Sequence, residues 1–141
     1  PPINLMYGLQ AALQMQKEEG LEAIFKRHEK ATAATRAAIK ALSLPLFAPD
    51  DAASPAITAV APISVDAEKV RSVMKKRFDI VLAGGQDHLK GKIFRMGHLG
   101  FVSPRDILAA IASLEATLIE LGNTQVTPGQ AVAAAAQILI Q

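Results

Sequence analysis

The sequence predicts an α+β domain in which helices cover one face of a small, mostly antiparallel sheet. Apolar residues recur at three- and four-residue spacing in several long segments, as they do on one face of a helix. Short runs of small and β-branched residues, ended by proline or glycine, lie between these segments. Half of the 141 residues are hydrophobic, which is enough for one self-supporting core.

Two helices are predicted at the start of the chain. In residues 3–17 the apolar side chains share one face, and Gly20 interrupts the helical pattern. A second helix of about six turns follows over residues 21–42. His28 lies on its apolar face, where we expect a partly buried ring with satisfied hydrogen bonds rather than a metal ligand.

Four short strands are predicted, and each is marked by proline or glycine. The first contains Pro45, which cannot donate to a ladder, and is therefore predicted at a sheet edge. The second stops at Pro62, the third at Gly84 and Gly85, and the fourth at Gly97. The four runs are residues 44–47, 57–61, 79–83 and 92–96.

Three further helices complete the predicted pattern. The first is capped by Ser64 or Asp66 and precedes the last two strands. The second begins at Ser103, whose side chain can cap a helix that carries Asp106 in its first turn. Thr127 repeats this capping pattern ahead of an alanine-rich segment. The inward side chains of the first of these helices are Val70, Val73 and Met74.

Composition and charge argue against several classes of function. Without cysteine the chain cannot build a thiolate metal site, an iron–sulfur cluster or a disulfide, and we expect a cytoplasmic location. The net charge is only +2 and both signs are interleaved, which argues against nucleic acid and membrane partners. The most apolar stretch, residues 131–140, is shorter than the ~20 residues of a membrane-spanning helix. Because helical sequence follows Pro1 and Pro2 without an initiator methionine, we expect a fragment of a longer protein.

The sequence predicts no metal site and no hydrolytic site. The three histidines, His28, His88 and His98, lack the spacing to one another and to carboxylates that metal sites show. No serine lies in a nucleophile-elbow motif. Gly84 and Gly85 lack the spacing of a phosphate-binding loop, and we expect them to form a tight turn with positive φ.

Arg95 is the candidate binding residue. It lies near the end of a predicted apolar strand and is followed by Gly97 and Gly100, which allow another backbone or a ligand to approach. On a rigid strand the planar guanidinium suits bidentate binding of a carboxylate. The residue pattern alone leaves this interpretation and a surface arginine paired with an acidic side chain equally open.

Four segments together resemble the C-terminal third of class V aminotransferases, which are fold-type I pyridoxal-phosphate enzymes. The resemblance is greatest to the serine/alanine–glyoxylate (serine–pyruvate) branch, which includes cyanobacterial proteins labelled as the small subunit of a soluble hydrogenase. Each motif alone is weakly specific, but their order is specific, and the resemblance covers about residues 1–122. The segments are residues 1–9 (PPINLMYGL), 20–28 (GLEAIFKRH), 78–85 (FDIVLAGG) and 94–100 (FRMGHLG).

The resemblance implies a cofactor and a substrate class. In the family, a lysine of the large domain holds pyridoxal phosphate as a Schiff base, and the full chain is a homodimer. Arg95 occupies the place of the arginine that binds the substrate α-carboxylate. The parent would move an amino group from serine or alanine to glyoxylate or pyruvate. No lysine here lies in the expected small-residue segment, so the isolated fragment is expected to contain no catalytic residue and to be inactive.

The resemblance also divides the chain. Residues 1–122 are expected to be the C-terminal small domain, with residues 1–19 as the helix that connects it to the large domain, and residues 123–141 as a C-terminal helical extension. The alternative function is a non-catalytic accessory or interaction subunit of the soluble hydrogenase type. Because the chain has no cysteine, such a subunit would accompany a partner that holds the metal.

Overall fold

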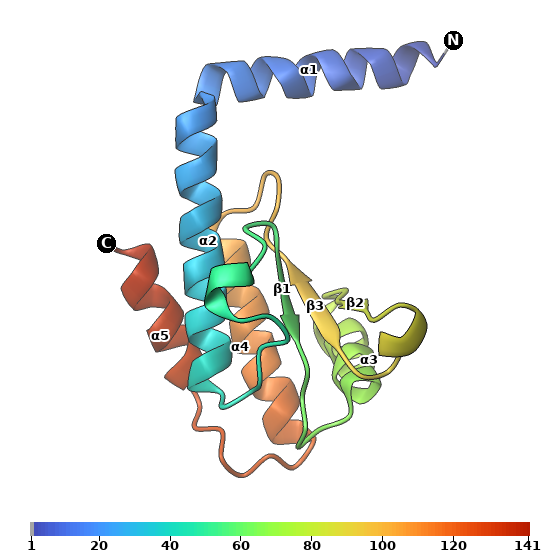
Figure 1. Cartoon of the computed structure of the whole chain (residues 1–141), viewed down its shortest axis with the longest axis vertical. Coiled ribbons are helices and arrows are strands. Elements are labelled where there is room, and N and C mark those ends of the chain that lie inside the picture. Colours follow the sequence, from blue (N-terminus) through green and yellow to red (C-terminus); the bar gives the residue numbers. More distant parts are fainter. Residues whose placement is uncertain (1) are drawn as a thin grey trace.

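The computed structural model describes residues 2–141, which form five α-helices and a three-stranded antiparallel sheet (Figure 1). Residue 1, where the predicted connecting segment begins, lies outside the described residues. The helices are α1 (Ile3–Glu19), α2 (Leu21–Ala41), α3 (Ala67–Phe78), α4 (Pro104–Glu120) and α5 (Gln130–Leu139). The strands are β1 (Ile57–Val60), β2 (Ala83–Gly84) and β3 (Phe94–Gly97), in the spatial order β1-β3-β2. The predicted α+β class is confirmed.

The sheet has one buried face and one open face. Val60 pairs with Phe94 and Thr58 with Met96, and all four side chains are buried. Directly opposite residues of an antiparallel pair point to the same face, so these four side chains form the inner face of the sheet. On that side α2 contacts β1, and α3 contacts both β2 and β3. The residues that alternate with them belong to the open face.

The second half of α2 is the centre of the core. Its inward positions carry Ala31, Ala34 and Ala38, each at most 5% exposed. Helix α5 packs along α2 and also contacts α4, and its Ala131 and Ala135 are fully buried (Figure 1). Because alanine side chains are short, the two helix backbones approach closely and gain dispersion contacts along their length.

A buried carboxylate holds the start of α5. Glu115 of α4 is 5% exposed and accepts hydrogen bonds from the N–H groups of Gly129 at 3.0 Å and Ala131 at 2.6 Å. The first N–H groups of a helix have no partner within the helix and lie at the positive end of its dipole, so a carboxylate is favourable there. The N-cap is therefore not Thr127, as the sequence predicted, but Gly129 in a left-handed conformation with φ of 88°.

The strands are shorter than the sequence predicted. Residues 44–47 form no strand, because only Leu46 makes a bridge, to Val60. Of residues 79–83 only the last lies in a strand. Asp79 ends α3 in a left-handed conformation with φ of 56°, and the N–H of Ile80 donates to the Met74 carbonyl. These two residues close the helix and are not available for strand pairing.

Gly84 and Gly85 are required by close packing and not by a special backbone angle. Neither has a positive φ, so the prediction of a left-handed turn is wrong. A Cβ atom on Gly85 would clash with the carbonyl oxygen of Leu89, and one on Gly84 would lie 2.8 Å from Nη1 of Arg71. The glycines let the segment after β2 and the Arg71 side chain approach the sheet edge.

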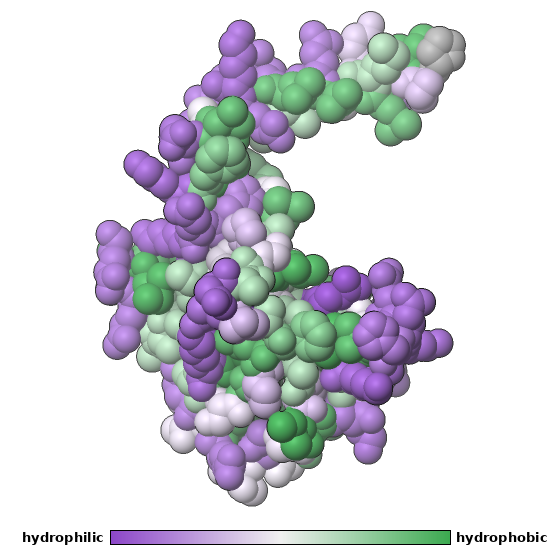
Figure 2. Space-filling model, viewed as in Figure 1, coloured by the Kyte–Doolittle hydropathy of each residue, from purple (hydrophilic) through white to green (hydrophobic). Residues whose placement is uncertain are grey.

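Helix α1 projects from the rest of the molecule (Figure 1). Among the helices and strands of residues 2–141 it contacts only α2, and it has no buried residue. Gly20, with φ of 84°, makes the sharp turn between the two helices. Figure 2 shows apolar side chains gathered along α1. The large ones that are more than half exposed are Ile3, Leu5, Met6, Tyr7, Leu9, Leu13 and Met15.

We expect the chain by itself to associate with other copies at high concentration, because α1 exposes a continuous apolar surface to water. Replacing Leu5 and Leu9 together by lysine should shift the chain to monomer in sedimentation velocity experiments over a range of concentrations. The control replaces Gln10 and Gln14 by lysine, which adds the same charge at polar positions of the same helix. Equal association of the two double variants would contradict a role for the apolar surface.

We expect Glu115→Ala to lower the free energy of unfolding by about 1–3 kcal/mol, because it leaves buried N–H groups at the start of α5 without a partner. Glu115→Gln, which keeps an oxygen acceptor, should lose less. The matched control is Glu120→Ala, since Glu120 lies in the same helix and forms only an exposed contact of 3.7 Å with Arg77. Its effect should stay below about 0.5 kcal/mol. Urea unfolding measures all three, and equal losses would mean that alanine packing alone holds α5.

Candidate functional site

Arg95 lies on the open face of the central strand. The sheet register sets it directly opposite Ala59 of β1 and Ala83 of β2. Its two neighbours in the chain, Phe94 and Met96, are buried and point toward the helices. The guanidinium therefore extends from the opposite face, between two small side chains.

One donor of Arg95 is fixed by a hydrogen bond, and its two terminal amino groups have no hydrogen-bond partner among residues 2–141. Nε donates to the carbonyl oxygen of Gly84 at 2.9 Å, and the residue is partly buried. No acidic side chain among residues 2–141 forms an ion pair with it. For the alternative interpretation, a surface arginine paired with an acidic side chain, Arg95 has no acidic partner among residues 2–141. A guanidinium held at Nε, with both terminal amino groups available, is arranged for a bidentate contact with a carboxylate.

His98, three residues after Arg95, is buried under the end of β3. It is 2% exposed, and its ring lies 2.9 Å from Oγ1 of Thr58 through Nε2 and 3.3 Å from Oγ1 of Thr32 through Nδ1. Burial lowers the pKa of His98, and the positive charge of Arg36 acts in the same direction. The folded structure therefore favours the neutral form of the ring.

The hydroxyl groups define which ring nitrogen of His98 carries the proton. Oγ1 of Thr32 lies 2.8 Å from two carbonyl oxygens, those of His28 and Pro55. Its one proton goes to a carbonyl, so the bond to His98 must be donated by the ring N–H at Nδ1. Nε2 then accepts from the Thr58 hydroxyl. Every ring nitrogen and hydroxyl of this group has a partner.

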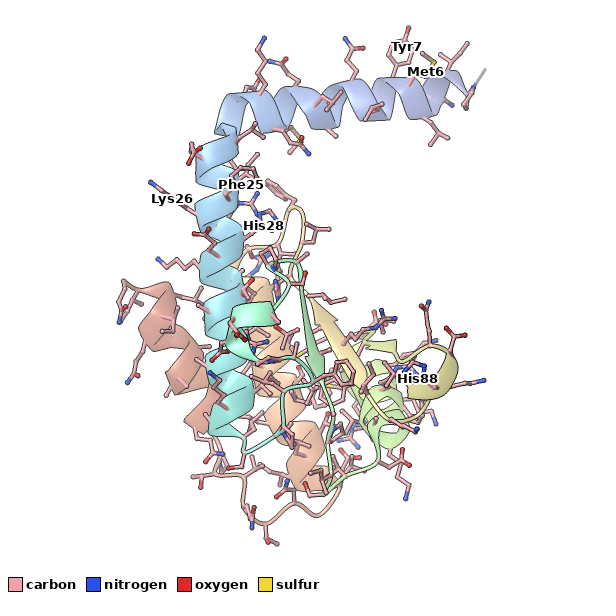
Figure 3. All side chains as sticks on the ribbon, viewed as in Figure 1. Met6, Tyr7, Phe25, Lys26, His28 and His88 are labelled. Atoms are coloured by element: carbon pink, nitrogen blue, oxygen red, sulfur yellow. The ribbon has the colours of Figure 1, made fainter. Side chains whose placement is uncertain are left out.

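The loop after β3 is also bound by α2. Nδ1 of His28 donates to the Ile24 carbonyl at 2.7 Å, and Nε2 accepts from the N–H of Gly100 at 2.9 Å. Nη1 of Arg27 donates to the Gly100 carbonyl at 2.6 Å, and the same guanidinium pairs with Glu19. Figure 3 shows His28 directed from α2 toward this loop. The predicted state of His28, a partly buried and hydrogen-bonded ring, is confirmed.

A cleft of about 510 Å³ lies beside this loop, between α1 and the start of α2. Its lining is mostly apolar and includes Met15, Ile24 and Phe101, with the Glu19–Arg27 ion pair on one wall. The hydrogen bond from Arg27 lowers the pKa of Glu19, which keeps this exposed pair charged.

Every lysine of the chain has an exposed side chain, so residues 2–141 by themselves do not enclose a lysine in the way that a pocket for Schiff-bound pyridoxal phosphate does. Within residues 2–141 no three His, Asp or Glu side chains come close enough together to hold a metal ion. The same residues include no helix long and apolar enough to cross a membrane.

Sequence comparison finds aminotransferases and two hydrogenase-named proteins, while no family model matches the chain. The chain is 41% identical over 141 residues to a serine–glyoxylate aminotransferase of Methylorubrum extorquens, which covers 99% of this chain and 35% of the relative. It is 67% identical over 139 residues to a Synechococcus protein named soluble hydrogenase, small subunit, covering 99% of this chain and 36% of that protein.

Solved structures give the same result. Ureidoglycine–glyoxylate aminotransferase from Bacillus subtilis matches with a TM-score of 0.89 and 36% identity, over 96% of this chain and 35% of that one. Pyridoxamine–pyruvate aminotransferase from Mesorhizobium loti matches with a TM-score of 0.91 and 31% identity, over 99% of this chain and 36% of that one.

The fold and these similarities match the chain to the small C-terminal domain of aminotransferases. Over almost its whole length the chain is similar to part of the serine–glyoxylate and ureidoglycine–glyoxylate aminotransferases, and this confirms the resemblance identified in the four motifs. The chain spans about a third of the length of the relatives that it matches.

Sequence reasoning selected Arg95 as a candidate but missed the group of buried polar residues under the end of β3. The signal was present, because Thr32 and His28 both lie on the apolar face of α2, where polar side chains need partners. Thr58 likewise occupies an inward position in β1, and His98 an inward position just beyond β3. Polar residues at inward positions of separate elements are candidates for one shared hydrogen-bond network.

We expect the stability of the chain to fall as the pH drops below 6.5, the ordinary pKa of histidine, because the unfolded chain binds a proton that buried His98 does not. The contribution of His98 is complete above that pH and is lost as the pH falls toward its lowered folded-state pKa. Urea unfolding between about pH 5 and 7.5 measures the slope, above the range in which carboxylates titrate. His98→Phe should flatten it. His88→Phe, at an exposed position, is the control, and equal slopes in both variants would contradict this assignment.

Proposed function

We propose that this chain is the C-terminal domain of a pyridoxal-phosphate-dependent aminotransferase and that Arg95 binds the α-carboxylate of its substrate. The observation that carries the proposal is the guanidinium on the open face of β3, fixed through Nε and without an acidic partner among residues 2–141. It is found in a domain whose sequence and fold match aminotransferases.

The surroundings of Arg95 leave room for a small carboxylate. Ala59 and Ala83 flank it across the sheet, and Gly97 is the next residue of β3 on the same face. A Cβ atom at Gly97 would meet nothing within 4 Å. A carboxylate can therefore reach both terminal amino groups in the plane of the fork, and charge-assisted hydrogen bonds of this kind are stronger than neutral ones.

The cofactor would be held outside this chain. Pyridoxal phosphate supplies an electron sink for amino-group transfer, and the protein supplies binding and orientation. Since every lysine here is exposed, we assign to this chain the orientation of the substrate and not the chemistry on the cofactor. We accordingly propose that the chain alone does not transaminate.

The substrates that we propose are based on the names of the relatives. They include aminotransferases named for serine and glyoxylate, for ureidoglycine and glyoxylate, and for pyridoxamine and pyruvate. The acceptors are small 2-oxo acids with one carboxylate, which a single arginine fork can bind. We propose a small amino acid, serine or alanine, as donor and glyoxylate or pyruvate as acceptor, in a cytoplasmic homodimeric parent.

A second candidate function is an accessory subunit of a soluble hydrogenase. It is favoured by the names of two relatives, from Synechococcus at 67% identity and from Anabaena cylindrica at 65% identity. A chain without cysteine would have to act beside a partner that holds the metal centre. Co-purification of a metal-containing partner, with no response of a cofactor band to amino acids, would favour this function.

We expect Arg95→Ala, made in the complete polypeptide that contains this domain, to raise KM for L-serine and to lower kcat/KM at least about 30-fold. Loss of a desolvated charge-assisted pair costs roughly 2–5 kcal/mol. Arg95→Lys should be intermediate, because an ammonium keeps the charge without the bidentate geometry. Arg105→Ala is the control, since the Arg105 side chain is 89% exposed.

The absorbance of bound pyridoxal phosphate, recorded before and after addition of L-serine or L-alanine, separates the outcomes. A band that shifts in the unchanged protein and shifts less in Arg95→Ala supports both the activity and the role of the arginine. A normal shift in Arg95→Ala would refute the role of Arg95 alone. The absence of any amino-acid-dependent band in the unchanged protein would refute the aminotransferase function.

A further inference from the structure

We infer that His98 is a positioning residue for Arg95, because it ties the end of β3 to α2 and β1 and thereby fixes the strand that carries the guanidinium. This inference rests on the proposed carboxylate-binding function of Arg95. It assigns a role to a buried side chain that does not touch the open face of the sheet.

The contacts of His98 join three separate parts of the fold. Its backbone N–H donates to the Ala56 carbonyl at 3.0 Å, which extends the β1–β3 ladder beyond its last paired residues. Its ring contacts Oγ1 of Thr58 in β1 at 2.9 Å and Oγ1 of Thr32 in α2 at 3.3 Å. The end of β3 is thus bound to one strand, to the segment before that strand, and to the central helix.

The second half of β3 needs this attachment because it has a neighbour on one side only. Strand β2 pairs with Phe94 and Arg95 and extends no further along β3. Met96 and Gly97 pair with β1 alone. A strand end without a ladder on one side opens more easily than a central strand. At this level of the sheet β2 no longer pairs with β3. Here the ring of His98 connects β3 to helix α2 instead.

Arg95 lies at the boundary between the two halves of β3. Toward β2 its Nε is fixed by the Gly84 carbonyl at 2.9 Å. On the other side, its backbone position depends on the Met96–His98 segment. The direction of the Arg95 guanidinium is therefore set by the hydrogen bond to Gly84 and by the attachment of β3 at His98. A shift of either contact moves both terminal amino groups.

A second contact reinforces the same attachment two residues later. Gly100 is bound by α2 through both of its backbone polar groups, to His28 and Arg27. Its neighbours Leu99 and Phe101 are 67% and 87% exposed. The loop is thus held by the Gly100 backbone while its own apolar side chains contribute little to the core.

An apolar side chain at position 98 would satisfy the core without any polar network. A buried neutral imidazole between two hydroxyl groups instead selects one geometry, because each partner requires a defined direction and distance. The only buried side-chain atom of residues 2–141 without a partner is Oγ1 of Thr117, so the group around His98 is fully satisfied. Such a network gives precise placement to the strand above it.

The test compares His98→Phe, Thr58→Val and His98→Gln in the complete polypeptide reconstituted with pyridoxal phosphate. His98→Phe keeps a buried ring without hydrogen bonds, and Thr58→Val removes one hydroxyl at nearly constant volume. We expect each of these two to raise KM for L-serine, by about 10-fold for His98→Phe, with a smaller change in kcat. His98→Gln can still reach Thr58 and should recover most of the affinity. His88→Phe is the control and should leave KM unchanged.

Amide hydrogen exchange gives a readout that does not need activity. In His98→Phe and Thr58→Val, exchange should become faster at residues 95–100, while the protection of α4 and α5 stays the same. If His98 only stabilised the fold, both variants would unfold at lower urea concentration with unchanged KM and unchanged local exchange, and this result would overturn the inference. Thr58→Val preserves volume, so it tests the same contact if His98→Phe does not fold.

The two proposals fail in different ways. If the unchanged complete polypeptide shows no amino-acid-dependent change of the cofactor band, the proposed function is wrong, and the role of His98 in substrate binding falls with it. If the unchanged protein transaminates and Arg95→Ala loses affinity, but His98→Phe and Thr58→Val retain the original KM, only the positioning role of His98 is wrong.

Discussion

The packing of the second half of α2 against β1, α4 and α5 is the contact on which the other elements depend. A sheet with strands as short as β1, β2 and β3 is not stable alone, and it needs a helix layer over its apolar face. Helix α5 is rich in alanine, and at ten residues it is too short to be stable in isolation. Both pack against α2, so the sheet and the C-terminal helix depend on the same element.

The first half of the same helix has a different role. It presents Arg27 and His28 toward the loop that follows β3, and Thr32, at the middle of the helix, lies toward the end of the sheet. The same helix thus contacts both the core and the loop that follows the strand of Arg95.

The helices were predictable and the sheet was predictable only in part. Helix starts such as Ser103 with Asp106 depend on residues close in sequence, and the structure contains that capping box. The extent of β2 depends on its pairing with β3, and the cap of α5 comes from Glu115, which is 14 residues before Gly129. Arg95 could be selected from its pattern and its motif. Its anchor on the Gly84 carbonyl could not, because that contact follows from a register that the sequence does not reveal.

The other arginines show what is unusual about Arg95. Arg36, 6% exposed, pairs with Asp50, and the partly buried Arg71 and Arg27 pair with Glu68 and Glu19. Removing a guanidinium from water is unfavourable unless an acid compensates for the lost hydration, and these three follow that rule. Among the described residues, Arg95 is the partly buried arginine that has only a carbonyl oxygen as partner. An anionic ligand would supply the negative charge that Arg95 lacks in the free domain. Because nothing there compensates Arg95 for its lost hydration, binding of a carboxylate is favoured.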